Sequence, residues 1–313
     1  MPELMALESE DRELDTKRAA LRETFADMER VLVAYSGGVD SAFLLWAALD
    51  ALGPERVLAV TASSPIFARR ELRAAEDLAH RLGAPHRFVR TMQLEDADVA
   101  DIQVGRTSES ASHLVDGAPV KFATNPPERC YLCKREIFAR LVEVAREEEI
   151  PWVVEGSNLD DRDEYRPGTR AVRELDVRSP LEEVGLTKAD IRALSRRVGL
   201  PTWNQPAQTC LATRFPHGTP ITRERLERVE AAEVVLREMG FGELRVRDHV
   251  DPAAGPIARI EVLREDVARL ARPEAAERVV AALRGLGYDY VTLDLGGYRR
   301  GGLSGQVGEV VDW

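Results

Sequence analysis

Residues 31–49 read VLVAYSGGVDSAFLLWAAL, and this stretch decides the fold. The apolar run Val31–Tyr35 predicts a buried strand, and Ala42–Leu49 predicts a helix that begins soon after it. The turn between them contains two adjacent glycines, which let the backbone approach a bound anion closely. The start of the helix directs free N–H groups and the positive end of its dipole toward phosphate oxygens, and two serines add hydroxyl donors. The segment Ser36–Ser41 is therefore predicted to bind phosphate groups.

Strands and helices alternate around this stretch, which is the pattern of a parallel sheet covered by helices. An amphipathic helix is expected at residues 4–29, ahead of the first strand. The other expected strands are Val57–Thr61, a segment around Phe88 and Val89, and Trp152–Glu155, and the other expected helices are Arg69–Leu82, 134–148 and Thr187–Val198. The predicted fold class is α/β.

The pattern changes after residues 201–221, a segment rich in proline and typical of a crossing between domains. We therefore predict two domains, residues 1–205 and 206–313. The second is expected to be a small α+β unit with an antiparallel sheet. Its expected elements are helix 222–239, strands Leu244–Arg247 and Ile257–Val262, helix 274–284 and strand Tyr290–Leu293.

The charge and hydropathy of the chain exclude several classes of protein. The 313 residues include 54 acidic and 43 basic side chains, a formal charge of -11. Binding to nucleic acid depends on neutralising backbone phosphates, so this acidity argues against nucleic acid as the main partner. The longest apolar run, Ala42–Leu49, is far shorter than the roughly 20 residues of a membrane span, and the N-terminus has no secretory signal pattern. We expect a cytoplasmic protein with neither nucleic-acid nor membrane partners.

The order of residues in the glycine turn distinguishes it from two other nucleotide-binding loops. A Walker loop requires Gly, four residues, Gly, Lys and Ser or Thr, and a dinucleotide loop requires G-x-G-x-x-G; neither pattern occurs here. The turn instead resembles the loop of the ATP pyrophosphatases (PP-loop), which include GMP synthetases, NAD synthetases and tRNA thiolases. The resemblance implies that the loop binds the pyrophosphate of ATP while an acceptor oxygen attacks the α-phosphate. The residues that it assigns to ATP are Ser36, Gly37, Gly38, Val39, Asp40 and Ser41, with Asp40 also a catalytic candidate.

An acidic cluster follows the expected strand Trp152–Glu155. It contains Asp160, Asp161 and Asp163. Folds of this class place ligands at the carboxyl ends of parallel strands, and carboxylate oxygens suit the Mg²⁺ that accompanies ATP phosphates. Asp160 and Asp161 are therefore candidate magnesium ligands. The alternative is a polar loop that caps the next element.

The three cysteines of the chain lie in two short motifs. Cys130 and Cys133 form a C-x-x-C, and Cys210 stands in the segment QTCLATR. A C-x-x-C is shared by redox pairs, zinc half-sites and iron–sulfur half-sites, and a third thiol favours a metal over a simple redox couple. Three thiolates would leave one position of a four-site cluster open. Zinc completed by His217 or His249 is the alternative.

Further motifs, taken together, resemble one family, the ATP-dependent sulfur transferases called LarE. The resemblance spans residues from about 30 to 303. Its motifs besides the loop are Asn125-Pro126, Arg129-Cys130-Tyr131-x-Cys133-Lys134, the segment Asn158–Gly168, Leu200-Pro201-x-Trp203 through Arg214, Leu244-Arg245-Val246-Arg247-x-His249, Ala258-Arg259-Ile260-Glu261 and Asp294-Leu295-x-Gly297-Tyr298-Arg299. It implies a PP-loop (adenine nucleotide α-hydrolase-like) domain followed by a smaller α+β domain that binds substrate and forms oligomers. The tail after Tyr298 departs from the family pattern.

The resemblance implies a small-molecule substrate, pyridinium-3,5-biscarboxylic acid mononucleotide. ATP would adenylate its carboxylates and sulfur would displace AMP, because a carboxylate is a poor electrophile until it is esterified. The product would be the thiocarboxylate precursor of the nickel-pincer nucleotide of lactate racemase, so a downstream nickel-inserting enzyme is an expected partner. A homo-oligomer is also expected from the family.

The family also implies roles for the cysteines and for three arginines. Members with one cysteine, at the position of Cys210, give up its sulfur, whereas members with three resemble enzymes that deliver sulfide from a [4Fe-4S] cluster. Because this chain has all three, cluster delivery is the favoured interpretation, with Cys130, Cys133 and Cys210 both catalytic and cluster-binding. Arg245 and Arg247 lie two apart on an expected strand and so share a face, and with Arg214 they match residues assigned to the substrate phosphate. The alternative for the strand pair is ion pairing on the sheet of an acidic protein.

Three alternative functions are open on the sequence. The sulfur donor could be Cys210 itself. The loop could belong to a tRNA thiolase or an amide ligase, although the chain has no basic RNA-binding extension and no glutaminase domain. A nucleotide- and metal-binding regulator without turnover is the third, and pyrophosphate release that depends strictly on the pyridinium substrate would exclude it.

Overall fold

The computed structural model describes residues 2–94, 114–115, 118–119, 121–162 and 167–299. Its internal contacts divide the chain into two units. The first comprises residues 1–120 and 128–208, and the second comprises residues 121–127 and 209–313. The short segment Lys121–Pro127 thus belongs with the C-terminal part of the chain, which no local sequence signal indicates.

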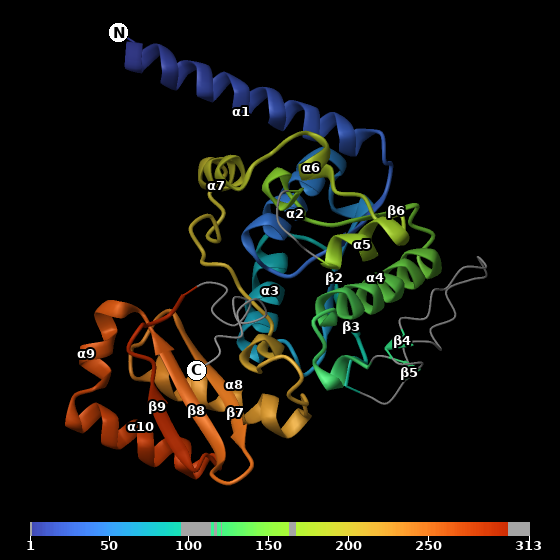
Figure 1. The fold of residues 1–313 in the computed structure, drawn as a ribbon. Helices are drawn as coiled ribbons and strands as arrows, with labels where there is room; N and C mark the ends of the chain where they lie inside the picture. Colours follow the sequence, from blue (N-terminus) through green and yellow to red (C-terminus); the bar gives the residue numbers. More distant parts are fainter. Residues whose placement is uncertain (1, 95–113, 116–117, 120, 163–166, 300–313) are drawn as a thin grey trace. The chain divides into compact units, whose positions relative to one another are not determined.

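The first unit is built on a parallel sheet with the order β3-β2-β1-β6 (Figure 1). Its strands are β1 (Val31–Ala34), β2 (Val57–Ser63), β3 (His86–Arg90) and β6 (Trp152–Val154). All three neighbouring pairs run parallel. The predicted α/β class with a parallel sheet is therefore confirmed.

Helices cover both faces of this sheet, because successive residues of each strand point to opposite faces. Val31 and Val33 pack into the core cluster that contains residues of α1, α2, α3, α6 and α7, whereas Leu32 packs into the cluster formed by α4 and α5. The helices are α1 (Pro2–Ala26), α2 (Val39–Leu52), α3 (Arg69–Arg81), α4 (Arg129–Glu147), α5 (Pro167–Glu174), α6 (Pro180–Glu183) and α7 (Lys188–Arg197), with 3-10 turns η1 (Pro54–Arg56) and η4 (Leu159–Arg162). A small antiparallel pair, β4 (Leu114–Val115) and β5 (Ala118–Pro119), lies outside the main sheet.

The second unit contains a three-stranded sheet with the order β7-β8-β9. Strands β7 (Leu244–Asp251) and β8 (Gly255–Val262) form an antiparallel hairpin. Strand β9 (Tyr290–Leu293) pairs parallel to β8, so the prediction of an antiparallel sheet is wrong for this strand. The reason is the connection: helix α10 (Pro273–Gly285) crosses over between β8 and β9 and returns the chain in the same direction.

The sheet of the second unit has one apolar and one charged face. Leu244 and Val246 of β7 pack into a core with α8 (Arg223–Glu238) and α10, while Arg245 and Arg247 alternate with them and point to the opposite face. The remaining elements of this unit are η3 (Phe122–Thr124), η5 (Leu211–Arg214), η6 (Arg264–Asp266) and α9 (Val267–Leu270). No helix in the described part of the chain has the length and apolar character that crossing a membrane requires.

Asp248 ties α8 to this sheet and is expected to be the largest single polar contribution to the stability of the second unit. It is fully buried and accepts hydrogen bonds from Arg225 Nε at 3.0 Å, Arg228 Nη2 at 3.0 Å and the Tyr288 hydroxyl at 3.2 Å. Asp248→Asn leaves two guanidinium groups without a buried counter-charge, so we expect a loss of about 3 kcal/mol in the free energy of unfolding.

Calorimetric unfolding measures this loss as a lower melting temperature. The control is Glu277→Gln, which removes a carboxylate from the exposed side of α10 and should change the stability by less than about 0.5 kcal/mol. Equal melting temperatures for the two variants would contradict the assignment.

Candidate functional site

The predicted phosphate loop connects β1 to α2 and is held in shape by its own hydroxyl groups. Ser41 Oγ accepts a hydrogen bond from Ser36 N at 3.2 Å, donates to the Gly38 carbonyl at 3.2 Å and lies 3.0 Å from Ser36 Oγ. Helix α2 begins after Gly38, which has no side chain to cap the helix. The backbone N–H groups of the first turn therefore have no capping side chain as a partner, and they point out of the N-terminal end of the helix. The loop therefore has the donors that a pyrophosphate group requires.

Gly37 is required by both its backbone conformation and its surroundings. Its φ of +76° lies in the left-handed region that favours glycine. A Cβ at this position would lie 2.8 Å from Ala75 Cβ and 2.9 Å from Ala75 Cα on α3. The loop thus packs against α3 with no space for a side chain.

The loop lies where the order of the sheet changes direction. From β1 the chain proceeds to β2 and β3 on one side, whereas β6 pairs with the other side of β1. The loops after β1 and β6 are consequently neighbours at the carboxyl edge of the sheet, which is where open α/β folds bind ligands. A Cβ on Gly156, just after β6, would lie only 3.1 Å from Ser41 N.

Lys188 joins the loops that follow β1 and β6. Its ammonium group forms an ion pair with Asp40, and its backbone N–H donates to Asp160 Oδ2 at 2.9 Å. Sequence analysis missed this lysine as a functional residue because its partner Asp40 is 148 positions away. The only local signal was the N-cap Thr187, which forms a capping box with Asp190 and places Lys188 at the start of α7.

The two predicted magnesium ligands hold the loop after β6. Asp161 Oδ2 accepts from Asn158 N at 3.1 Å, and Asp160 accepts from Lys188 N, as in a polar loop that caps the next element. Asp163 lies outside the described residues. Among the residues that the structure describes, no group of three or more His, Cys, Asp or Glu side chains is placed to hold a metal ion. The magnesium assignment stays a prediction.

Cys130 and Cys133 lie one turn apart at the start of α4. Cys130 is exposed, Cys133 is half-buried, and Gln93 Nε2 approaches Cys133 Sγ at 3.8 Å. Cys210 belongs to the second unit, at the residue that precedes η5, and like the other two it carries a thiol and forms no disulfide. Three thiols, two of them at i and i+3 on one helix, fit the donor set of an iron–sulfur cluster in chemistry.

The two histidines considered as zinc ligands both belong to the second unit. His249 lies on β7, and burial, together with the nearby positive charge of Arg259, lowers its pKa below the usual value. Neither histidine is placed in a group of three potential metal ligands among the described residues. In the first unit, Trp203 packs under the Arg196 guanidinium, whose carbon lies 5.1 Å from the ring centroid.

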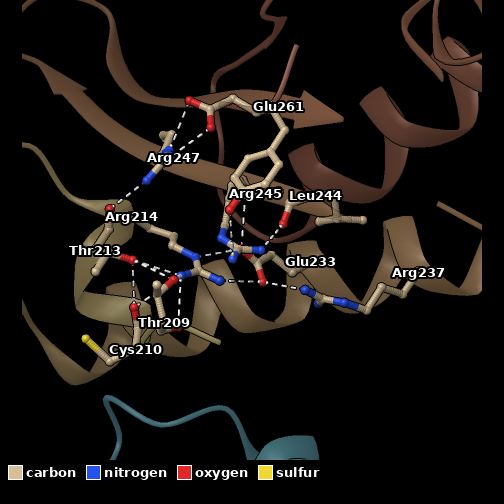
Figure 2. Close-up of polar contacts among 12 residues, drawn as sticks. Thr209, Cys210, Thr213, Arg214, Glu233, Arg237, Leu244, Arg245, Arg247 and Glu261 are labelled. Carbon is tan, nitrogen blue, oxygen red and sulfur yellow. Dashed lines mark hydrogen bonds and ion pairs between the residues drawn. The ribbon is translucent and has the colours of Figure 1, made fainter. Parts of the chain in front are cut away.

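Buried arginines and glutamates form a network behind the charged face of β7 (Figure 2). Arg214 Nε donates to Glu233 Oε1 at 2.8 Å, and Arg237 binds the other oxygen of the same carboxylate at 2.8 Å. Arg247 forms a two-pronged pair with Glu261, at 3.0 and 2.8 Å. Two of the three arginines predicted to bind phosphate thus already have carboxylate partners.

Arg245 differs from these arginines because no carboxylate lies within 4.0 Å of it among the described residues. Its guanidinium donates to the Leu244 carbonyl at 2.7 Å and to the Tyr298 hydroxyl at 3.4 Å, and it lies 4.9 Å from the Tyr298 ring centroid. It is 8% exposed, and burial, reinforced by the charge of Arg214, lowers its pKa. A buried cation that has no carboxylate in direct contact can form an ion pair with a bound anion.

Glu233 makes the stability of the second unit dependent on pH in the acid range. Burial by itself raises the pKa of this carboxyl, but the charges of Arg214 and Arg237 reverse the effect and lower it from 4.5 to about 2. Because the folded state holds the ionised form, this stabilisation is complete above pH 4.5 and is lost as the pH falls toward 2. We expect a loss on the order of 3 kcal/mol across that window, by the relation between pKa shift and free energy.

Denaturant unfolding at a series of pH values between 6 and 2 measures this loss. Glu233→Gln, which cannot ionise, should show a shallower fall than the parent protein over the same range. Parallel curves for the two proteins would show that Glu233 does not carry the dependence.

Known proteins with similar sequences include a mononucleotide synthase, in agreement with the phosphate loop described above. Residues 15–117 match the family model of NAD synthase. The chain is 36% identical over 296 residues to the pyridinium-3,5-bisthiocarboxylic acid mononucleotide synthase of Lactiplantibacillus plantarum, covering 92% of this chain and 94% of that protein. It is also 36% identical over 291 residues to an uncharacterized protein of Synechocystis sp., covering 93% and 98%, and 33% identical over 179 residues to an uncharacterized protein of Methanocaldococcus jannaschii, covering 57% and 67%. The phosphate loop, the sheet that carries it and this identity over nearly the full length of the synthase show that the chain belongs to the LarE family of ATP-using sulfur transferases.

Proposed function

We propose that this protein adenylates the carboxylates of pyridinium-3,5-biscarboxylic acid mononucleotide and then replaces AMP with sulfur. The observation that carries the proposal is the surroundings of Cys210. In one unit, the backbone carbonyl of this residue accepts a hydrogen bond from Arg214, and Arg247 of β7 donates to the carbonyl of nearby Thr213. Arg245, a buried cation without a carboxylate partner among the described residues, lies two residues before Arg247 on the same strand. If this cation bound the phosphate of an anionic mononucleotide, the reacting carboxylate would lie in the same unit as the sulfur-bearing residue Cys210. The similarity to the Lactiplantibacillus synthase supports the choice of substrate.

The first step uses the loop Ser36–Ser41. A carboxylate oxygen of the substrate attacks the α-phosphorus of ATP, a new P–O bond forms, and the bond to the β-phosphate oxygen breaks so that pyrophosphate leaves. The N–H groups at the start of α2 and the Lys188 ammonium would stabilise the charge on the departing group. Asp40, now paired with Lys188, would be released to hold Mg²⁺, with Asp160 and Asp161 as further candidates.

The substrate phosphate is proposed to bind on the charged face of β7. Arg245 would be the principal ligand, because binding gives this buried cation the direct anionic contact that no described carboxylate provides. Arg247 lies two residues further on the same face, and its position is maintained by Glu261. Binding through the phosphate is independent of the reacting carboxylates, so the substrate can present them one after the other.

In the second step, sulfur attacks the acyl carbon and AMP leaves with its phosphate oxygen. A [4Fe-4S] cluster held by Cys130, Cys133 and Cys210 would supply sulfide to the acyl adenylate. The alternative donor is Cys210 itself: its Sγ would form the new bond to the acyl carbon, and loss of the Cα proton with cleavage of the Cβ–S bond would leave dehydroalanine. The first route conserves the cysteine, whereas the second consumes it.

We also propose that the product is the precursor of the nickel-pincer nucleotide of lactate racemase. The product would pass to a nickel-inserting enzyme, because thiocarboxylate sulfur is a suitable ligand for that metal. The active form is proposed to be a homo-oligomer, as in the family that the chain resembles.

The decisive experiment measures pyrophosphate release from ATP with and without the pyridinium mononucleotide. Release that requires this substrate, with a thiocarboxylate as the product, is the expected result. Release that requires tRNA instead would identify a tRNA thiolase, and ATP binding without any release would identify a regulator.

The sulfur donor is decided by the metal content of protein purified without oxygen. About four iron and four acid-labile sulfide per chain, absent from Cys130→Ala, would support the cluster. Protein that contains no iron after anaerobic reconstitution, and that loses the mass of one hydrogen sulfide from Cys210 after turnover, would show the sacrificial route.

A further inference from the structure

We infer that Arg214 is a positioning residue for Cys210 and that it does not bind the substrate phosphate. The inference rests on the proposed function, because it assigns a task within the sulfur step of that reaction. Arg214 differs from Arg245 in one respect that matters here: its guanidinium is already engaged on both sides.

One side of the guanidinium holds the backbone around Cys210 (Figure 2). Arg214 Nη1 lies within hydrogen-bonding distance of the Thr209 carbonyl at 3.0 Å and the Cys210 carbonyl at 3.1 Å. The same nitrogen lies 2.8 Å from the hydroxyl oxygens of both Thr209 and Thr213. Four acceptors from three residues therefore converge on a single nitrogen, which fixes the chain on either side of the thiol.

The other side of the guanidinium is fixed by Glu233. Nε and Nη2 of Arg214 donate to its two carboxylate oxygens at 2.8 and 3.3 Å. Both side chains are 2% exposed, and Glu233 is itself held by Arg237 and by the backbone N–H of Val246. A phosphate at Arg214 would have to displace a buried, doubly supported carboxylate, which is costly because that charge would lose its counter-charge.

The contacts of Arg214 to Cys210 involve the backbone of the cysteine and not its sulfur. The Cys210 carbonyl faces Arg214 and also accepts from the Thr213 hydroxyl at 2.8 Å, whereas the Cys210 side chain points away from the guanidinium (Figure 2). With this geometry, Arg214 can orient the Cys210 sulfur through the backbone without forming an ion pair with its thiolate.

The same contacts link the cysteine to the phosphate site. Arg247 Nη1 donates to the Thr213 carbonyl at 2.8 Å, so the segment Thr209–Thr213 is held by Arg214 from one side and by Arg247 from β7. Arg247 lies next to Arg245 on the face proposed to bind phosphate. The sulfur-bearing segment is therefore hydrogen-bonded to Arg247, and Arg245 lies on the same strand face, so the two sites are joined through β7 and the acyl carbon and the sulfur would stay in register.

A lysine cannot replace Arg214 in this role. The planar guanidinium fork presents its donors to Glu233 on one edge and to the Cys210 segment on the other, whereas an ammonium is a single point charge. Positioning therefore predicts that Arg214→Lys fails to restore function although it keeps the charge. If Arg214 instead bound the substrate phosphate through its charge alone, Arg214→Lys would restore most of the function.

The test compares the order of the Cys210 segment in Arg214→Lys and Arg214→Met with that in the parent protein. Protein freed of metal with a chelator is treated with iodoacetamide, and the alkylation rate of each cysteine is followed by peptide mass spectrometry. Cys130 and Cys133, which lie in the first unit, are internal references in every sample. The matched control is Arg237→Met, which removes the other arginine on Glu233 but no contact to Cys210.

We expect the alkylation rate of Cys210 to rise by at least about 5-fold in both Arg214 variants, because local opening releases the segment. The rates of Cys130 and Cys133 should stay within about 2-fold, as should that of Cys210 in Arg237→Met. If the Arg214 variants do not fold, Thr213→Val removes one hydroxyl from the same clamp and should shift the Cys210 rate in the same direction by a smaller factor. An unchanged Cys210 rate in variants that fold would overturn the inference.

Kinetics provide the second readout. Misplacement of a reacting group by about 1 Å costs on the order of 100-fold, so kcat for thiocarboxylate formation should fall by about that factor while KM for the pyridinium substrate stays within about 3-fold. A rise in KM of more than about 10-fold, restored by Arg214→Lys, would instead identify a phosphate ligand. Alkylation is measured without substrate, so a failure of the proposed reaction and a failure of this inference give different results.

Discussion

Gly37→Ala is expected to lower ATP-dependent pyrophosphate release by at least about 100-fold, the cost of displacing a reacting group by about 1 Å. The new Cβ would lie 2.8 Å from Ala75 Cβ and 2.9 Å from Ala75 Cα, so the loop and α3 cannot both keep their positions. The residue is also held at a φ of +76°, where a side chain adds about 1 kcal/mol of strain. Displacement of the loop moves the N–H groups at the start of α2 away from the phosphates of ATP.

Gly53→Ala separates these two causes. Gly53 has almost the same φ, +77°, but a Cβ there would meet no atom within 4 Å. It therefore carries the conformational cost without the collision. Pyrophosphate release with the pyridinium substrate, together with ATP binding by calorimetry, should place Gly53→Ala within about 3-fold of the parent protein. Similar losses in the two variants would show that the collision with α3 is not the cause of the loss in Gly37→Ala.

Arg245→Met is expected to raise KM for the pyridinium mononucleotide by about 100-fold, the value of one strong charge-assisted contact to phosphate. Its effect on stability should be the reverse of that of most buried substitutions. Arg245 is buried without a carboxylate partner in the described part of the chain, so replacing it with an apolar chain of similar length should leave the melting temperature unchanged or raise it. A variant that is at least as stable as the parent protein but binds substrate poorly would separate binding from folding.

Two further variants complete this experiment. Arg245→Lys keeps the charge but loses the fork geometry, so its KM should lie between those of the parent protein and Arg245→Met. Arg278→Met removes a positive charge from the exposed side of α10 and controls for the net charge of the unit. A KM for Arg245→Met that matches the KM for Arg278→Met would show that the phosphate does not bind at Arg245.

The parts of the fold that were predictable from the sequence are those set by local patterns. The run Val31–Ala34 is apolar on both faces because it lies between two helical layers, and two glycines mark the turn into α2. Thr187 similarly marked the start of α7. The parallel pairing of β9 was not predictable in this way, because strand direction depends on the crossover through α10 and not on the composition of Tyr290–Leu293.

For the candidate site too, local sequence patterns predict some features and long-range contacts determine the others. By itself, the sequence determined which chemistry is available: a glycine loop for phosphates, three thiols and a pair of arginines on one strand face, because these follow from residue type and from spacing along a single element. Only the tertiary structure decided which of these groups are engaged. Among the described residues, Glu233 and Glu261 neutralise Arg214 and Arg247 but leave Arg245 without a carboxylate, and Lys188 crosses to Asp40. Such pairings join residues far apart in the chain, so burial and distance determine them, and no local pattern encodes either.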